Sequence, residues 1–143
     1  FLAEGATGPL FDMFVLIANP ADTDAEPPLV LAACDPAQPY GAALAWPDNP
    51  GRPSRAAGAQ VVLRHGRPLV YLERGGHSLT LFPEAAHDTS WVAGLASLVA
   101  SGQLRSLEIR KVDGAPAGER PDVTELLLAA GFRSGYRGPI LRR

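Results

Sequence analysis

The sequence predicts a single α+β domain over residues 1–143, with a mainly antiparallel, curled or barrel-like sheet and two covering helices. Three observations predict this class. Residues 58–82 contain three short apolar runs separated by turns, which is the pattern of an antiparallel meander. Residues 91–99 carry apolar side chains at helical spacing, and a second helical segment begins at Pro121. A small sheet needs a cover for its apolar face, and these helices can supply it.

The meander is defined by its turns. Its first run, residues 61–63, stops at His65-Gly66, where glycine accepts a positive φ and can close a two-residue hairpin. The second run, residues 68–72, begins with a proline at a strand position that can spare its N–H. Gly75-Gly76 forms the next turn. Apolar and polar side chains alternate in the third run, residues 77–82, so one face is expected to be buried and the other partly wet.

Both helices carry recognisable end signals. In the first helix, residues 88–90 can supply the N-cap and Gly102 the left-handed C-terminal cap. The second helix opens at Pro121-Asp122, continues through three leucines at 126–128 and stops at Gly131. The apolar residues of the first helix follow a spacing of 0, 1, 4, 7 and 8 along one face: Trp91, Val92, Leu95, Leu98 and Val99.

The remaining strands and loops are predicted from shorter patterns. Strands are expected around residues 14–17, over residues 29–33, over residues 103–112 with one charged face, and once or twice in the C-terminal tail. Residues 21–28 have, apart from two prolines, no apolar side chain larger than alanine, so an exposed, mobile loop is expected. Five prolines within residues 34–58 exclude a long helix and predict a structured loop or broken strand.

Composition narrows the class of protein. With 46% hydrophobic and 20% charged residues, the chain resembles an ordinary soluble domain, and no apolar run reaches the roughly 20 residues of a membrane span. The chain starts at Phe1 without a secretory leader, which predicts a fragment of a longer protein. The single Cys34 permits no internal disulfide, which suits a cytoplasmic location.

Charge is distributed unevenly along the chain. The net charge of −2 combines −7 in residues 1–50 with +2 in residues 51–104 and +3 in residues 105–143, where eight basic residues face five acidic ones. A surface that binds phosphate is therefore expected in the later two thirds of the chain.

Motifs for cofactors and metals are missing from the sequence. Neither GxxxxGK[ST] nor GxGxxG occurs, so no ATP site is expected within these residues. His65, His77 and His87 have no metal-ligand spacing with one another or with Cys34, so no metal site is predicted. No catalytic residue is predicted either.

Aromatic residues and arginines in and beside the proline-rich loop predict a site for single-stranded nucleic acid, because rings stack on bases and guanidinium groups hold phosphates. An equal alternative is that the two aromatic residues of the loop fill the core beneath it. The residues predicted to bind are Tyr40, Trp46, Arg52, Arg55, Arg74 and Arg137.

Three segments carry a resemblance to a known family. They are DPAQPYGAALAWP at 35–47, GAQVVLRHGRPLVYLERGG at 58–76 and AGFRSGYRGPILR at 130–142. Together they resemble the extreme C-terminal part of the bacterial large helicase-related proteins of the long Lhr type, over most of residues 29–143.

The resemblance implies an accessory module of a superfamily 2, ATP-dependent, 3′-to-5′ DNA helicase linked to DNA repair. ATP and Mg would bind in an upstream motor. Tandem winged-helix domains, similar to those of alkylation-repair glycosylases, would lie between the motor and this segment, which would form a terminal β-barrel. The implied partners are DNA, bound weakly and without sequence preference, or an RNA–DNA hybrid.

Three functions remain open. The first is a DNA-binding or scaffolding module without catalysis. The second is a part of a glycosylase site for uracil or alkylated bases, for which Asp35 and Glu73 are the plausible carboxylates. The third is an architectural domain that forms homo-oligomers through an exposed apolar patch.

Overall fold

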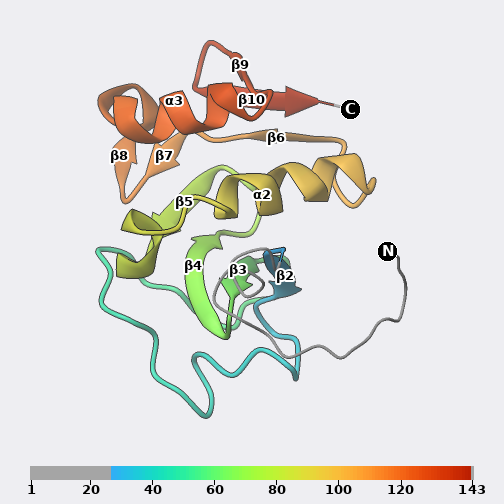
Figure 1. Cartoon of the computed structure of the whole chain (residues 1–143), viewed down its shortest axis with the longest axis vertical. Helices are drawn as coiled ribbons and strands as arrows, with labels where there is room; N and C mark the ends of the chain where they lie inside the picture. The colour runs from blue at the N-terminus through green and yellow to red at the C-terminus, as the bar shows by residue number, and fades with distance from the viewer. Residues whose placement is uncertain (1–26, 143) are drawn as a thin grey trace, which may run out of the picture.

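The computed structural model describes residues 27–142, which form two β-sheets with a helix between them (Figure 1). The predicted strand at residues 14–17 and most of the predicted loop at residues 21–28 lie outside the described residues. The elements are, in chain order, β2 (Leu29–Ala32), β3 (Gln60–Arg64), β4 (Arg67–Leu72), β5 (Ser78–Leu81), η1 (Pro83–Ala86), α2 (Trp91–Ala100), β6 (Ser106–Glu108), β7 (Lys111–Val112), β8 (Ala115–Pro116), η2 (Ala117–Glu119), α3 (Pro121–Ala129), β9 (Arg133–Ser134) and β10 (Pro139–Arg142).

The larger sheet has the strand order β2-β3-β4-β5-β7-β8 and is antiparallel except for the pair β5 and β7. The predicted meander forms its centre. His65 and Gly66, with φ of 53° and 77°, close the turn between β3 and β4. Gly75 and Gly76 also have positive φ and close the turn into β5, as their position between two apolar runs predicts.

The smaller sheet, β6-β10-β9, is antiparallel and is built from the C-terminal third of the chain. The prediction of one strand over residues 103–112 is wrong, because this segment divides between the two sheets. The Ile109 N–H donates to the Pro139 carbonyl in the smaller sheet, whereas the next N–H, of Arg110, donates to the His77 carbonyl in the larger one. The chain therefore crosses from one sheet to the other at Ile109-Arg110.

The described strands form no closed barrel. The larger sheet ends at β2 on one side and at β8 on the other, and these two edges do not pair with each other. The α+β class, the mainly antiparallel pairing and the two helices are as predicted. No helix within residues 27–142 is both long and apolar enough to cross a membrane.

Helix α2 fills the space between the sheets. It contacts β2 and β3 on one side and β10 on the other, and its five predicted core residues are all buried. Ser90 is the N-cap residue but its side chain makes no capping bond; the Ser90 N–H instead donates to Oδ1 of Asp88 at 2.9 Å. A β-carbon on Gly94 would lie 2.9 Å from Cγ1 of Val62, so the helix approaches β3 closely at this position.

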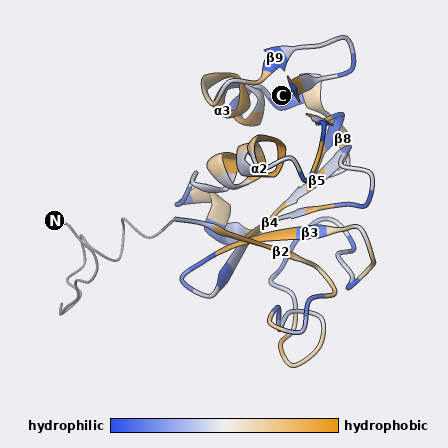
Figure 2. Ribbon diagram, turned by 90° about the vertical axis from the view of Figure 1, so that its right-hand side faces the viewer, coloured by the Kyte–Doolittle hydropathy of each residue, from blue (hydrophilic) through white to orange (hydrophobic). Residues whose placement is uncertain are grey.

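The central strands β3, β4 and β5 of the larger sheet are buried on both faces. Figure 2 colours β2, β3, β4 and α2 as largely hydrophobic. One face packs on α2, and the other packs under the loop between β2 and β3. The prediction that one face of the third run is partly exposed to water is therefore wrong for Thr80 and Phe82, whose side chains are 5% and 2% exposed. The loop covers them, since Trp46 stacks on Phe82.

Replacing Trp91, which is 1% exposed, by alanine should lower the free energy of unfolding by about 3–5 kcal/mol, because it removes the largest side chain that α2 places in the core. Urea denaturation measures this change. The matched control is Tyr136→Ala, since that ring is 103% exposed and its loss should change stability by less than about 0.5 kcal/mol. Equal midpoints for the two variants would contradict the central position of α2.

Candidate nucleic-acid interface

The aromatic residues of the proline-rich loop pack on the larger sheet. Trp46 lies parallel to Phe82, with 5.9 Å between ring centroids and 9° between planes, and meets Tyr71 edge-on at 5.7 Å. The Tyr40 ring is 6.1 Å from Trp46, and its hydroxyl donates to the Gly66 carbonyl at 2.9 Å. Both side chains are half-buried, which fits the predicted alternative that they fill the core beneath the loop.

Arg55 holds the same loop together from within. Its guanidinium donates to the carbonyls of Gln38, Asp35 (3.1 Å) and Tyr40 (3.3 Å). The Gln38 side chain, which is 0% exposed, continues this network by donating to the Ala33 carbonyl at 2.8 Å. The charge of Arg55 is therefore directed toward the loop backbone.

The structure does not bring the six predicted binding residues together. Arg52 is exposed in the loop before β3, and Arg74 is exposed in the turn between β4 and β5. Arg137 lies in the other sheet, in the turn between β9 and β10. Binding of nucleic acid by Arg52, Arg74, Tyr40 and Trp46 stays a prediction.

A second group of cationic side chains gathers on the outer face of the smaller sheet. Ile140 pairs with Glu108 on one side and with Arg133 on the other, so these three side chains share one face, and Arg142 lies two residues further along the same face. The inner face carries Leu107 and Leu141, which pair directly and pack toward the core. Alternation along β10 thus directs Ile140 and Arg142 outward and Leu141 inward.

Two further arginines join this surface through Glu108. Arg110 donates from Nε to Oε1 of Glu108 at 2.7 Å, and Arg137 is close enough to act on the same carboxylate. The hydrogen bond from Arg110 lowers the pKa of Glu108, and the positive charges of Arg137 and His77 add to this effect. We call Arg110, Arg133, Arg137 and Arg142 together the arginine face; with Glu108 ionised, they leave a net charge of +3.

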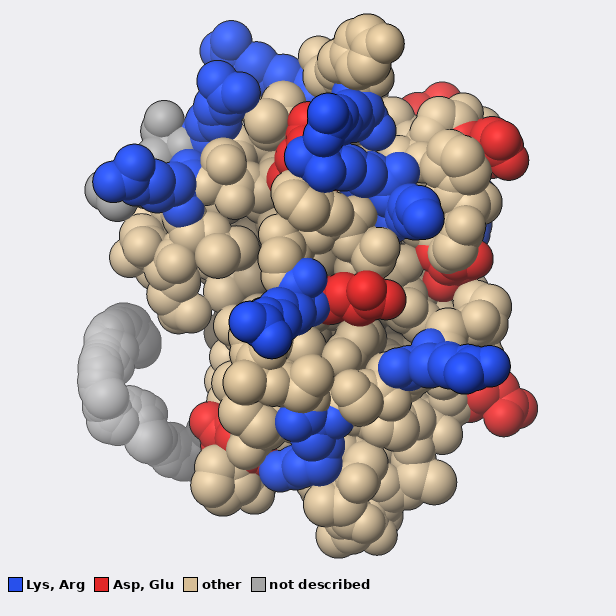
Figure 3. Space-filling view, turned by 180° about the vertical axis from the view of Figure 1, so that it is seen from behind, with Lys and Arg blue, Asp and Glu red and all other residues tan. Residues whose placement is uncertain are grey.

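Figure 3 shows lysine and arginine side chains gathered in the upper part of the molecule, where Figure 1 places β9 and β10. A groove of about 470 Å³ runs along this edge and is lined by Gly131, Arg133, Ser134, Ile140, Leu141 and Arg142. Exposed guanidinium groups beside an open groove are suited to an extended, negatively charged ligand.

The turn between β9 and β10 projects from this surface. It is closed by the Gly135 N–H, which donates to the Gly138 carbonyl at 3.1 Å. Gly138 has φ of 153°, and a β-carbon there would collide with the Ile109 carbonyl, so only glycine lets the turn pack against the end of β6. The two residues between these glycines, Tyr136 and Arg137, are both exposed.

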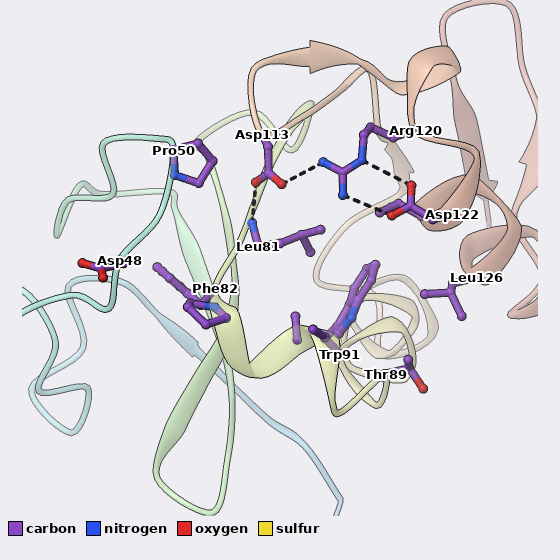
Figure 4. A pocket seen from close by; sticks show the side chains of 14 residues that line it. Asp48, Pro50, Leu81, Phe82, Thr89, Trp91, Asp113, Arg120, Asp122 and Leu126 are labelled. Carbon is purple, nitrogen blue, oxygen red and sulfur yellow. Dashed lines mark hydrogen bonds and ion pairs between the residues drawn. The ribbon is translucent and has the colours of Figure 1, made fainter.

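A cleft of about 570 Å³ lies on another side of the molecule, between η1 and α3 (Figure 4). Its polar end is a clamp in which Arg120 donates to Asp113 at 2.9 Å and to Asp122 at 3.2 Å, while Asp113 also accepts the Leu81 N–H at 2.8 Å. The hydrogen bond from Arg120 lowers the pKa of Asp122. Since these charged groups bind one another, the clamp joins β5 to the start of α3.

The carboxylates considered for a glycosylase site line neither the groove beside β10 nor the cleft between η1 and α3. Asp35 accepts the Ala37 N–H at 2.8 Å, and Glu73 is exposed at the end of β4. Residues 27–142 also contain no group of three or more histidine, cysteine, aspartate or glutamate side chains that could hold a metal ion.

An open apolar groove of about 610 Å³ lies between α2 and α3. Alanine is its commonest lining residue, and Val92 and Leu126 supply the larger side chains. Because the side chains of both helices are small here, the groove has room for another apolar segment.

Fold and surface together define an α+β module with a cationic sheet face. Over 123 residues, 80% of the chain, it is 44% identical to a protein of Mycolicibacterium smegmatis (strain ATCC 700084 / mc(2)155) named "Lhr helicase/ probable uracil glycosylase", and it matches 8% of that protein. It is 35% identical over 121 residues, 78% of the chain, to "Lhr helicase/uracil glycosylase" of Escherichia coli (strain K12), and it matches 7% of that protein. No protein-family model matches the chain.

These relatives identify the chain as a module of the Lhr helicase type. The chain spans less than a tenth of the length of either relative.

Sequence reasoning found one residue of the arginine face, Arg137, and missed Arg110, Arg133 and Arg142. The sequence of the tail could have indicated Arg142. Ile140 and Arg142 are two residues apart, so they must share a face if the tail is a strand. Arg133 and Arg110 join them only through strand pairing and side-chain contact across distant parts of the chain.

The role of Arg55 inside the loop can be separated from its charge. Arg55→Lys keeps the charge but cannot reach three carbonyls with one planar group, so it should lower the free energy of unfolding by about 1–3 kcal/mol. Arg52→Lys is the matched control and should stay within about 0.5 kcal/mol of wild type, because Arg52 is exposed. Chemical denaturation compares them, and equal stabilities would show that the Arg55 network is dispensable.

Proposed function

We propose that the chain is an accessory nucleic-acid-binding module of an Lhr-type helicase and that the arginine face is its contact surface. The observation that carries this proposal is the gathering of four arginines on and beside the outward face of the smaller sheet, where only Arg110 and Arg137 act on the carboxylate of Glu108. A cationic surface of this kind neutralises backbone phosphates, which supplies affinity without reading sequence. Binding to DNA, or to an RNA–DNA hybrid, is accordingly weak and insensitive to sequence.

The parent protein in this proposal is an ATP-dependent 3′-to-5′ DNA helicase that acts in DNA repair. Its motor binds ATP and Mg elsewhere in the parent chain, and winged-helix domains precede this C-terminal module. Support comes from the two relatives, whose names include "Lhr helicase" and of which this chain matches 7–8%. The module contributes a phosphate contact to nucleic acid that the motor engages.

Scaffolding is the second candidate function, and the groove between α2 and α3 favours it. Burial of an apolar segment from another part of the parent chain would remove its alanine-rich walls from water. None of the four arginines of the arginine face lines the groove, so the two functions are compatible.

The proposal predicts how binding responds to salt. Replacing Arg133 and Arg137 together by glutamine should reduce the slope of log K against log salt by roughly 0.9 per lost phosphate contact on duplex DNA, or about 0.7 on a single strand. Fluorescence polarisation with a labelled oligonucleotide, titrated with NaCl, measures this slope.

The control for this experiment is Arg52→Gln with Arg67→Gln. Arg67 begins β4 at the opposite end of the molecule from β9 and β10 (Figure 1), and its ion pair with Glu84 is exposed. This variant removes the same charge as the test variant from the competing surface, which includes the predicted binding residue Arg52. If the arginine face is the contact surface, the slope should stay unchanged in this variant. A slope that falls only in the control would move the contact surface to the proline-rich loop and the β3–β4 turn.

A further inference from the structure

We propose that Tyr136 stacks on an unpaired base, so that the arginine face binds single-stranded nucleic acid in preference to duplex. This inference rests on the proposed function and adds the class of nucleic acid that the surface selects. It is carried by the exposure of the ring, by the rigid stem beneath it and by the arginines on either side.

Tyr136 is exposed to an unusual degree. Its side chain is 103% exposed, whereas the other exposed large apolar residues, Leu29, Leu44 and Leu128, range from 38% to 55%. Within residues 27–142 the Tyr136 ring makes no hydrogen bond and no contact with another ring. Both faces of the ring are therefore available to a ligand.

The backbone that carries the ring is held by the stem of the turn. Ser134 pairs with Pro139 and Arg133 with Ile140, which brings the turn directly onto a paired stretch of β9 and β10. The Ile109 N–H, which donates to the Pro139 carbonyl at 2.9 Å, ties the stem to the end of β6. Because this backbone is ordered before binding, only the side-chain torsions of Tyr136 lose freedom when a base stacks on the ring.

Arginines lie on either side of Tyr136 in the chain. Arg137 adjoins Tyr136 in the turn, and Arg133 lines the groove that continues along β9 and β10 to Arg142. Sites for single strands combine such a cationic groove with an aromatic side chain that stacks on a base. In a duplex the bases are already stacked on one another. The phosphates of duplex DNA can therefore contact the arginines, but no base face is free to stack on the Tyr136 ring.

The test is Tyr136→Ala, measured by fluorescence polarisation at one salt concentration with three ligands of equal length: oligo(dT), a duplex, and a strand with the same backbone in which every position is abasic. The variant should bind oligo(dT) about 5- to 160-fold more weakly, since stacking contributes ~1–3 kcal/mol per base. Binding to the duplex and to the abasic strand should not change. Tyr136→Phe should retain wild-type affinity because it keeps the ring.

Oligo(rU) of the same length distinguishes RNA from DNA as the strand that is bound. The loss caused by Tyr136→Ala should be similar for oligo(rU) and oligo(dT), because the face of a base does not depend on the sugar. A loss confined to one of the two would show that the sugar is read and would overturn simple stacking.

Other outcomes separate this inference from the proposed function. If Tyr136→Ala leaves oligo(dT) binding unchanged while Arg133→Gln with Arg137→Gln weakens it, stacking is overturned and the arginine face stands. An equal loss on oligo(dT), duplex and abasic strand also overturns stacking. If the wild-type chain binds none of these ligands, both proposals fail.

Discussion

The burial of helix α2 between two sheets is the constraint on which the rest of the structure depends. Trp91, Leu95 and Leu98 are at most 1% exposed, and the helix contacts both the larger sheet and β10. Gly94 allows the close approach to Val62 that this packing requires. The two sheets have six and three strands, and each has an apolar face that packs on the shared helix.

This packing also determines which surface is cationic. Because Leu107 and Leu141 face α2 and α3, the alternating residues of β6 and β10 must face outward. Those outward positions hold Glu108, Ile140 and Arg142, and the crossing of the chain at Arg110 adds another guanidinium beside them. The arginine face is therefore a consequence of the same alternation that builds the core.

Local patterns were sufficient to predict the meander, both helices and the turn at His65-Gly66. Features set by distant contacts could not be predicted in this way. The division of residues 103–112 depends on Pro139 and His77, and the burial of Phe82 depends on Trp46 in a loop that has no regular pattern. The same limit applies to the site, since Arg133 and Glu108 come to lie on one face only because both pair with Ile140, one on each side.

Nucleic acid, as we propose, contacts the smaller sheet and the turn between β9 and β10. Hydrogen–deuterium exchange of the 143-residue chain, with and without saturating oligo(dT), tests this contact most directly because it compares both candidate surfaces in one experiment. We expect slower amide exchange in residues 105–110 and 131–142 when oligo(dT) is bound, and unchanged exchange in residues 38–57. Slower exchange confined to residues 38–57 would contradict the account and assign binding to the loop of Tyr40 and Trp46.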